Sequence, residues 1–203
     1  MWSMHNWMKE AFRTNRTFDS VVRELVTAKG STYSNGPANY FRIFRNATEL
    51  TESTAQLFLG VRLECAKCHH HPFEKYGQDD YYAFSAFFAR VGTKRSEEFG
   101  LFGNESVVIV KTSGEASNPR TRKRLEPTPL EGEPTDHPLD RRIALADWLT
   151  AKDNGYFAKS TVNRYMSYLL GRGLVEPVDD LRSTNPPTNP DLLDALAKHF
   201  AEN

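Results

Sequence analysis

The segment Ala55-Gln-Leu-Phe-Leu-Gly-Val-Arg-Leu-Glu-Cys-Ala-Lys-Cys-His-His-His-Pro72 joins an apolar run to both cysteines of the chain. Its first half, residues 55–63, carries apolar side chains at intervals that predict a helix. Because proline lacks a backbone N–H, Pro72 ends any helix that carries the cysteines. We therefore expect a helix that leads directly into the cysteine motif.

The two cysteines and the histidine that follows them have the spacing of a c-type haem attachment site. Cys65 and Cys68 are one helical turn apart, so both thiols can reach the vinyl groups on one edge of a porphyrin. His69 comes next and can turn its ring toward the iron as an axial ligand. The motif predicts haem c at Cys65, Cys68 and His69.

Three other interpretations of the motif stay open. The thiols could form a redox-active disulfide, although the flanking sequence lacks the βαβ pattern usual for that motif. Cys65, Cys68, His69 and His71 could instead hold zinc or iron, since zinc prefers thiolate and imidazole ligands. Structural zinc sites usually draw their second ligand pair from a distant segment, whereas these four are crowded together. The last interpretation is two buried cysteines beside surface histidines.

Composition limits the function classes. The 203 residues suffice for one domain with a core or for two small ones. Lys+Arg and Asp+Glu both number 26, so the zero net charge argues against a nucleic-acid partner. The basic run 120–124 lies among glutamates and is typical of a solvated hairpin or loop. No apolar run is long enough to span a membrane.

The fold class that the pattern predicts is mainly α, with a small central β-hairpin and a second helical segment. The strand at 107–110 is β-branched and is expected to pair back near residues 124–125. Tyr81, Phe84 and Phe88 form an aromatic stripe that is more typical of core than of a cofactor wall. The expected helices cover 17–28, 81–90, 140–149, 157–170 and a segment that starts at Asn189-Pro190. We place domain boundaries so that the parts are 1–95, 96–135 and 136–203.

Two blocks of sequence resemble a pair of known families. Residues 58–73, 78–82 and 86–90 resemble the C-terminal part of the planctomycete cytochrome c-like domain of unknown function. Residues 141–149, 161–164, 171–180 and 185–190 resemble the start of the companion planctomycete domain that follows it. At His70 the family commonly has Asp or Asn, and at Tyr76 commonly Trp. Neither difference touches the thiols, His69 or His71.

The resemblance implies a fragment of a longer protein that is periplasmic or otherwise exported. With the motif, the leading interpretation is a haem c-type redox protein that serves electron transfer with a redox partner protein. The alternatives are a non-haem zinc or iron site or structural module of a larger exported enzyme or binding protein, and an interaction scaffold without a cofactor. Residues 1–7 lack the features of a signal peptide, so we expect that the chain either is a fragment of a longer exported protein or carries no haem.

Whether the chain is an enzyme is left open. Asn163, Arg164, Asp179, Asp180 and Arg182 are expected to form an ion-pair and capping network rather than an acid–base site. The candidates for the distal haem ligand are Met166, Met8, His5 and His137.

Overall fold

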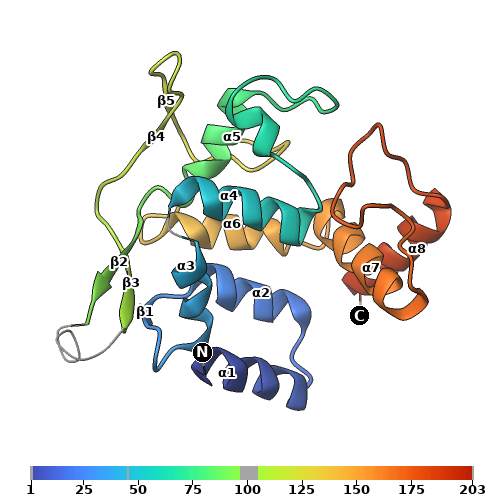
Figure 1. The fold of residues 1–203 in the computed structure, drawn as a ribbon, viewed down its shortest axis with the longest axis horizontal. Helices are drawn as coiled ribbons and strands as arrows, with labels where there is room; N and C mark the ends of the chain where they lie inside the picture. The colour runs from blue at the N-terminus through green and yellow to red at the C-terminus, as the bar shows by residue number, and fades with distance from the viewer. Residues whose placement is uncertain (1, 45, 97–104, 203) are drawn as a thin grey trace. The chain divides into compact units, whose positions relative to one another are not determined.

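The structure is a computed structural model that describes residues 2–44, 46–96 and 105–202 (Figure 1). The chain forms two compact units, and each unit combines two separated stretches of sequence. Unit 1 contains Met1–Leu50 and Ala83–Thr150, and unit 2 contains Thr51–Tyr82 and Ala151–Asn203. The expected mainly helical fold is confirmed, and the β structure includes a small antiparallel sheet. The domain boundaries expected after residues 95 and 135 divide the chain into consecutive parts, and they stay predictions.

Unit 1 contains most of the helices that the N-terminal sequence predicts and both sheets. Its elements are α1 (Trp2–Arg13), α2 (Phe18–Thr27), β1 (Gly30–Ser31), η1 (Gly36–Asn39), α3 (Tyr40–Ile43), β2 (Val91–Arg95), β3 (Ser106–Val110), β4 (Ala116–Ser117), β5 (Arg124–Leu125) and α6 (Arg141–Leu149). The helices expected over 17–28 and 140–149 are confirmed. Asp140 begins α6 because its side chain accepts a hydrogen bond from the Arg142 backbone N–H.

The strands of unit 1 pair differently from the expectation. β3 contains the predicted strand, but it lies between β1 and β2 in an antiparallel order β1-β3-β2. β5 pairs instead with β4, in a separate two-stranded ribbon. The expected hairpin between 107–110 and 124–125 is therefore wrong. Asn118 closes the β4–β5 turn, since its side-chain oxygen accepts the backbone N–H groups of Arg120 and Thr121.

A buried ion pair joins α6 to the N-terminal helices of unit 1. The Arg142 side chain is fully buried, and its guanidinium donates to the Asp140 carboxylate and to the Ala28 carbonyl at 2.7 Å. The same guanidinium lies over the Phe41 ring, 4.7 Å from its centroid. A buried charge needs such partners because its desolvation is costly.

Unit 2 is helical and carries the cysteine motif. It contains η2 (Ala55–Leu59), η3 (Glu64–Lys67), α7 (Gly155–Leu170) and α8 (Pro190–Glu202). α4 (Ala47–Thr54) and α5 (Gln78–Ser85) each cross from one unit to the other. α8 begins as expected, with the Asn189 side chain accepting the Leu192 backbone N–H at 3.0 Å. In the described stretches, no helix has the length and apolar character needed to cross a membrane.

Candidate functional site: the cysteine turn and a polar pocket

The cysteines lie on a short 3-10 turn and not at the end of a long helix. α4 widens into the π-helical turn η2, which ends at Leu59, so the helix expected over 55–63 is wrong in its second half. Gly60 ends the turn because its φ of 67° lies in the left-handed region, which glycine adopts readily. Three residues without helical structure then lead into η3, which carries Cys65.

Both thiols are accessible at the surface of unit 2. Cys65 and Cys68 are exposed and free of a disulfide, so the interpretation as buried cysteines is wrong. The backbone N–H groups of Cys68 and His69 both reach the Cys65 carbonyl at 3.3 Å. This tight turn keeps Cys65, Cys68 and His69 in one short loop, as the predicted haem motif requires.

The two histidines that compete for a ligand role differ in their hydrogen bonds. His69 Nδ1 lies 2.6 Å from the His70 carbonyl oxygen, which can only accept, so Nδ1 carries the proton. The Nε2 lone pair of His69 is then free for a metal. His71 Nδ1 accepts the Phe73 backbone N–H at 3.2 Å, which places the proton of the neutral ring on Nε2. The two rings thus differ in which nitrogen carries the proton: Nδ1 in His69 and Nε2 in neutral His71.

The four-ligand arrangement is not assembled in this structure. Over residues 2–44, 46–96 and 105–202, no three His, Cys, Asp or Glu side chains gather closely enough to hold a metal ion. Cys65, Cys68, His69 and His71 therefore lie on the same loop without converging on a common point.

Residues of α4 and α5 hold the cysteine turn in place. The Gln78 side-chain amide donates to the carbonyl oxygens of Lys67 and Cys68 at 2.9 and 3.1 Å. Lys67 pairs with Glu52 at 3.1 Å, and the same carboxylate oxygen accepts the buried Tyr81 hydroxyl at 2.6 Å. The hydrogen bond to Glu52 raises the pKa of Lys67 above its ordinary value. The end of the turn that carries Lys67 and Cys68 is thus attached to both helices.

The loop after the histidines is attached to residues 180–183 within unit 2. The Arg182 guanidinium lies over the exposed Phe73 ring, 4.9 Å from its centroid. Burial raises the pKa of Glu74, against the opposing effect of a hydrogen bond from the Ser183 backbone. Asp180 is buried and pairs with Arg182 at 3.4 Å.

The other companion residues form the expected structural network. Asn163 is fully buried, and its side chain bonds the backbone of Val175 and the carbonyl of Val178. Arg164 donates at 3.3 Å to the carbonyl of Gln56, inside the π-helical turn. Burial raises the pKa of Asp179, but hydrogen bonds from Gln56 and Arg62 outweigh this effect and hold the pKa below its ordinary value. These contacts connect the cysteine-bearing stretch to residues 174–185.

The aromatic stripe after the motif is core. Tyr81, Phe84, Phe87 and Phe88 are each no more than 1 % exposed, so they are not available to line a cofactor. Phe84 makes an edge-to-face contact with Trp148 of α6 within unit 1. Of the candidates for a distal ligand, Met166 is in unit 2 with the cysteines, whereas His5, Met8 and His137 are in unit 1.

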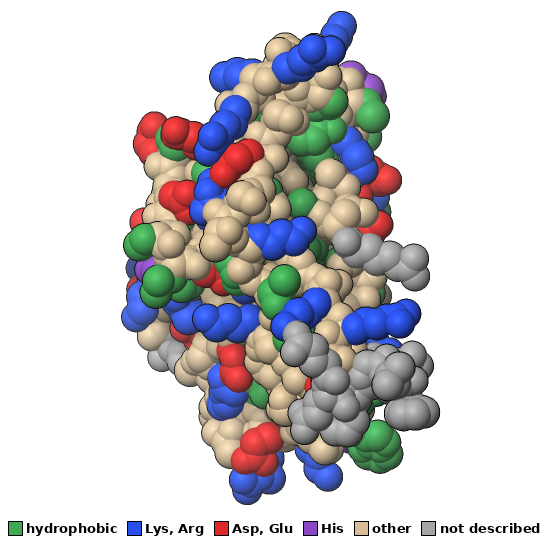
Figure 2. All heavy atoms as spheres, turned by 90° about the vertical axis from the view of Figure 1, so that its left-hand side faces the viewer, with side chains coloured by type: hydrophobic (Ala, Val, Ile, Leu, Met, Phe, Trp, Pro, Cys, Tyr) green, Lys and Arg blue, Asp and Glu red, His purple; other side chains and the backbone are tan. Residues whose placement is uncertain are grey.

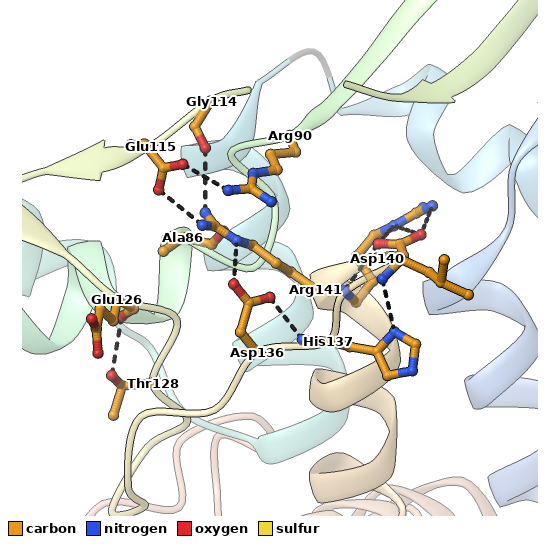
Figure 3. A network of polar contacts seen from close by, with 12 residues as sticks. Ala86, Arg90, Gly114, Glu115, Glu126, Thr128, Asp136, His137, Asp140 and Arg141 are labelled. Atoms are coloured by element: carbon orange, nitrogen blue, oxygen red, sulfur yellow. Dashed lines mark hydrogen bonds and ion pairs between the residues drawn. The ribbon is translucent and has the colours of Figure 1, made fainter. Parts of the chain in front are cut away.

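A second site, which sequence reasoning did not find, lies in unit 1. We call it the arginine pocket: it has a volume of about 470 Å³, and its charged lining residues are Arg90, Glu115, Arg124, Glu126, Asp136 and Arg141. Figure 3 shows Arg90 and Arg141 directed at Glu115 from two different elements. These residues are spread along the chain from position 90 to position 141, so no local motif marks them.

Three guanidinium groups surround Glu115 in this pocket. Arg90 and Arg141 contact its carboxylate at 2.8 and 2.9 Å (Figure 3), and Arg124 contacts it at 3.1 Å. The hydrogen bond from Arg90, together with those from Arg141 and the charge of Arg124, lowers the pKa of Glu115 to about 2, although burial opposes this shift. Arg141 is 4 % exposed and also pairs with Asp136 at 3.2 Å. The three guanidinium groups thus hold Glu115 in its charged form, while Glu126 and Asp136 balance the remaining positive charge of the pocket lining.

Comparison with known proteins finds two domain families of unknown function in succession and gives no activity. Residues 1–93 match a family described as a protein of unknown function (DUF1549). Residues 141–203 match a second family, described as a protein of unknown function (DUF1553). No curated protein matches the chain, and no solved structure does. The chain is thus similar to two families in the predicted order.

Proposed function

We propose that unit 2 is a covalent haem c-binding module for electron transfer, with thioether bonds at Cys65 and Cys68 and with His69 as the axial ligand. The observation that carries the proposal is the hydrogen bond from His69 Nδ1 to the His70 carbonyl oxygen, at 2.6 Å. This bond orients the ring and leaves Nε2 as the donor atom, as is usual for metal-ligating histidines.

The two thiols also support the proposal. Both are exposed and free of a disulfide on one tight turn, which supports the approach of a porphyrin edge from the surface. Gln78 bonds the backbone carbonyl of Cys68 and fixes its position relative to α5. Bound haem would supply reversible one-electron transfer at its iron. The protein residues hold and orient it.

The non-haem alternative differs from this proposal at His71. A zinc or iron site formed by Cys65, Cys68, His69 and His71 needs the His71 ring to give up its contact with the Phe73 backbone N–H. A haem site needs no such change, because His71 makes no bond to the cofactor. His71 therefore distinguishes the two functions.

The test is production of the protein in an exporting host that has haem-attachment machinery. We expect one covalently bound porphyrin per chain in the denatured mass spectrum, with a c-type absorbance spectrum. Cys65→Ala with Cys68→Ala should abolish the covalent attachment, and His71→Ala should retain it. His70→Ala is the matched control, because its backbone carbonyl, which accepts from His69, survives the substitution.

Three results would overturn the proposal. Porphyrin that stays covalently attached in the variant that lacks both Cys65 and Cys68 would refute the role of the two thiols. A porphyrin-free protein that binds stoichiometric zinc or iron, and loses it in His71→Ala, would establish the four-ligand alternative. A folded product with neither group would make the module a scaffold.

A further inference from the structure

The C-terminal end of α7 exposes a group of large apolar side chains. We call this group the α7 tip and define it as Tyr165, Tyr168, Leu169 and Leu170, which are 45, 71, 77 and 69 % exposed. Figure 1 shows this end of the helix at the edge of unit 2. A single exposed leucine is normal at a protein surface, whereas neighbouring exposed apolar side chains are typical of an interaction surface.

The directions of these side chains favour a fluid partner over a rigid one. Successive residues of an α-helix are rotated by about 100°, so Tyr168, Leu169 and Leu170 together span about 200° around the axis of α7. A protein surface that packs against one side of a helix covers an apolar stripe of about 100°. The acyl chains of a lipid layer, in contrast, surround a helix end and bury all three side chains.

The charges beside the α7 tip are basic. Arg164 and Arg172 border the tip in the sequence, and no charged residue lies between them. Arg164 donates at 3.5 Å to the carbonyl of Leu57, whose side chain is also exposed. Among the residues that the structure describes, neither arginine forms an ion pair with a carboxylate. Arginines that border an apolar surface in this way are complementary to anionic lipid headgroups.

We propose that the α7 tip inserts into the surface of a bilayer that contains anionic phospholipids. Leu169 and Leu170 then lie among the acyl chains, and the tyrosine hydroxyls and the two guanidinium groups lie at the level of the headgroups. Insertion is shallow, because the last carbonyl groups of a helix lack intrahelical donors and need water. This inference does not depend on haem binding, since no residue of the tip belongs to the cysteine turn.

Two features of unit 1 provide matched controls. Leu139 is 79 % exposed, like Leu169, but it is a single leucine beside Asp140. Arg120 and Arg122 are exposed at the tip of the β4–β5 hairpin, and Figure 2 shows Lys and Arg side chains around this tip at the top of the face. The hairpin turn has no large apolar side chain to insert, so Arg120→Gln separates general attraction to an anionic surface from insertion of the α7 tip.

The experiment is flotation of the full chain with vesicles of phosphatidylcholine alone and with vesicles of equal parts phosphatidylcholine and phosphatidylglycerol. We expect binding to the mixed vesicles and weaker binding to phosphatidylcholine. Leu169→Ser should lower the partition coefficient on the order of tenfold, because it removes a buried leucine. Arg172→Gln should lower it about fivefold, and only on the mixed vesicles.

The control variants should differ clearly from these two. Leu139→Ser should leave the partition coefficient unchanged, and Arg120→Gln should lower it much less than Arg172→Gln does. Thermal unfolding of every variant checks that it is folded, which we expect because all of the substituted side chains are exposed.

The proposal is overturned if the chain binds neither kind of vesicle, or if Leu139→Ser weakens binding as much as Leu169→Ser. Loss of binding in Arg120→Gln but not in Leu169→Ser would also overturn it, because the hairpin would then hold the vesicle. Sedimentation velocity of the unchanged protein tests the competing occupant. Self-association that is lost in Leu169→Ser, without vesicle binding, would assign the α7 tip to a second copy of the chain.

Discussion

Gly60 shows how one residue controls the path of the chain into the cysteine turn. Its positive φ ends the π-helical turn, and its backbone carbonyl accepts the Leu181 N–H at 2.8 Å. A Cβ at this position would lie 2.6 Å from the Leu181 side chain. Both the backbone conformation and the close packing therefore require glycine.

Gly60→Ala should lower the free energy of unfolding by about 2 kcal/mol or more, from left-handed strain of about 1–2 kcal/mol and the contact with Leu181. Urea unfolding followed by circular dichroism measures the loss. Gly171→Ala is the control: Gly171 has a φ of 74°, and a Cβ there would meet no atom within 4 Å, so this variant should show the strain alone. Equal losses at the two sites would contradict the role of Leu181.

Glu115 should make the stability of unit 1 depend on pH. Its folded-state pKa of about 2 is below the ordinary value of 4.5, so its contribution is complete above about pH 4.5 and is lost as the pH falls through 2. Since the side chain is 27 % exposed, we expect Glu115→Gln to cost about 1–2 kcal/mol at pH 7.

The measurement is the unfolding midpoint of the unchanged protein and of Glu115→Gln between pH 7 and pH 2. The difference between the two midpoints should be constant from pH 7 down to about pH 4.5 and should shrink below that pH. Glu10→Gln is the control, because Glu10 pairs with Arg13 on an exposed helix surface and should cause no measurable loss. A difference that persists unchanged at pH 2 would refute the ion-pair explanation.

At the scale of elements, α6 is the helix that holds unit 1 together. It is capped by Asp140 and packs against α2, and its buried Arg142 donates to carbonyls at the end of α2. The same carboxylate of Asp140 serves as helix cap and as counter-charge. The Asp140 side chain therefore stabilises unit 1 in two ways.

Asp140→Ala should therefore destabilise the protein by about 3–5 kcal/mol, because it leaves a buried guanidinium without its anion. Asp147→Ala, in the same helix, removes a half-exposed pair with Arg23 and should cost less than about 1 kcal/mol. Chemical denaturation of both variants gives the comparison. Similar losses of stability in the two variants would show that the buried ion pair of Asp140 with Arg142 stabilises the protein no more than the exposed pair does.

For the whole molecule, the two compact units differ from the two matched families in how they divide the chain. The match to the second family begins at residue 141, at the start of α6, yet α6 belongs to unit 1. Residues from both matched segments therefore contribute to unit 1. We expect that neither segment folds as an independent piece.

A fragment that ends at residue 135 should lack a cooperative unfolding transition, because it has lost α6 and the Arg142 contacts of unit 1. A fragment that ends at residue 150 retains all of unit 1 and should keep the transition. Thermal unfolding of the two fragments tests this expectation. Equal cooperativity in both would mean that α6 is dispensable to the core.

Local sequence patterns were sufficient to locate most of the helices, but not the 3-10 turn that carries Cys65. The capping signal at Asn189 and the apolar spacing of the other segments indicated the helices, because these signals act within a few residues. The pairing of β3 with β2, the end of the helix at Gly60 and the arginine pocket depended on contacts between distant residues. Glu115 meets Arg90 and Arg141 only after the chain has folded, since each lies 25 or 26 positions away. Short-range periodicity carries no information about such encounters, so they follow from packing alone.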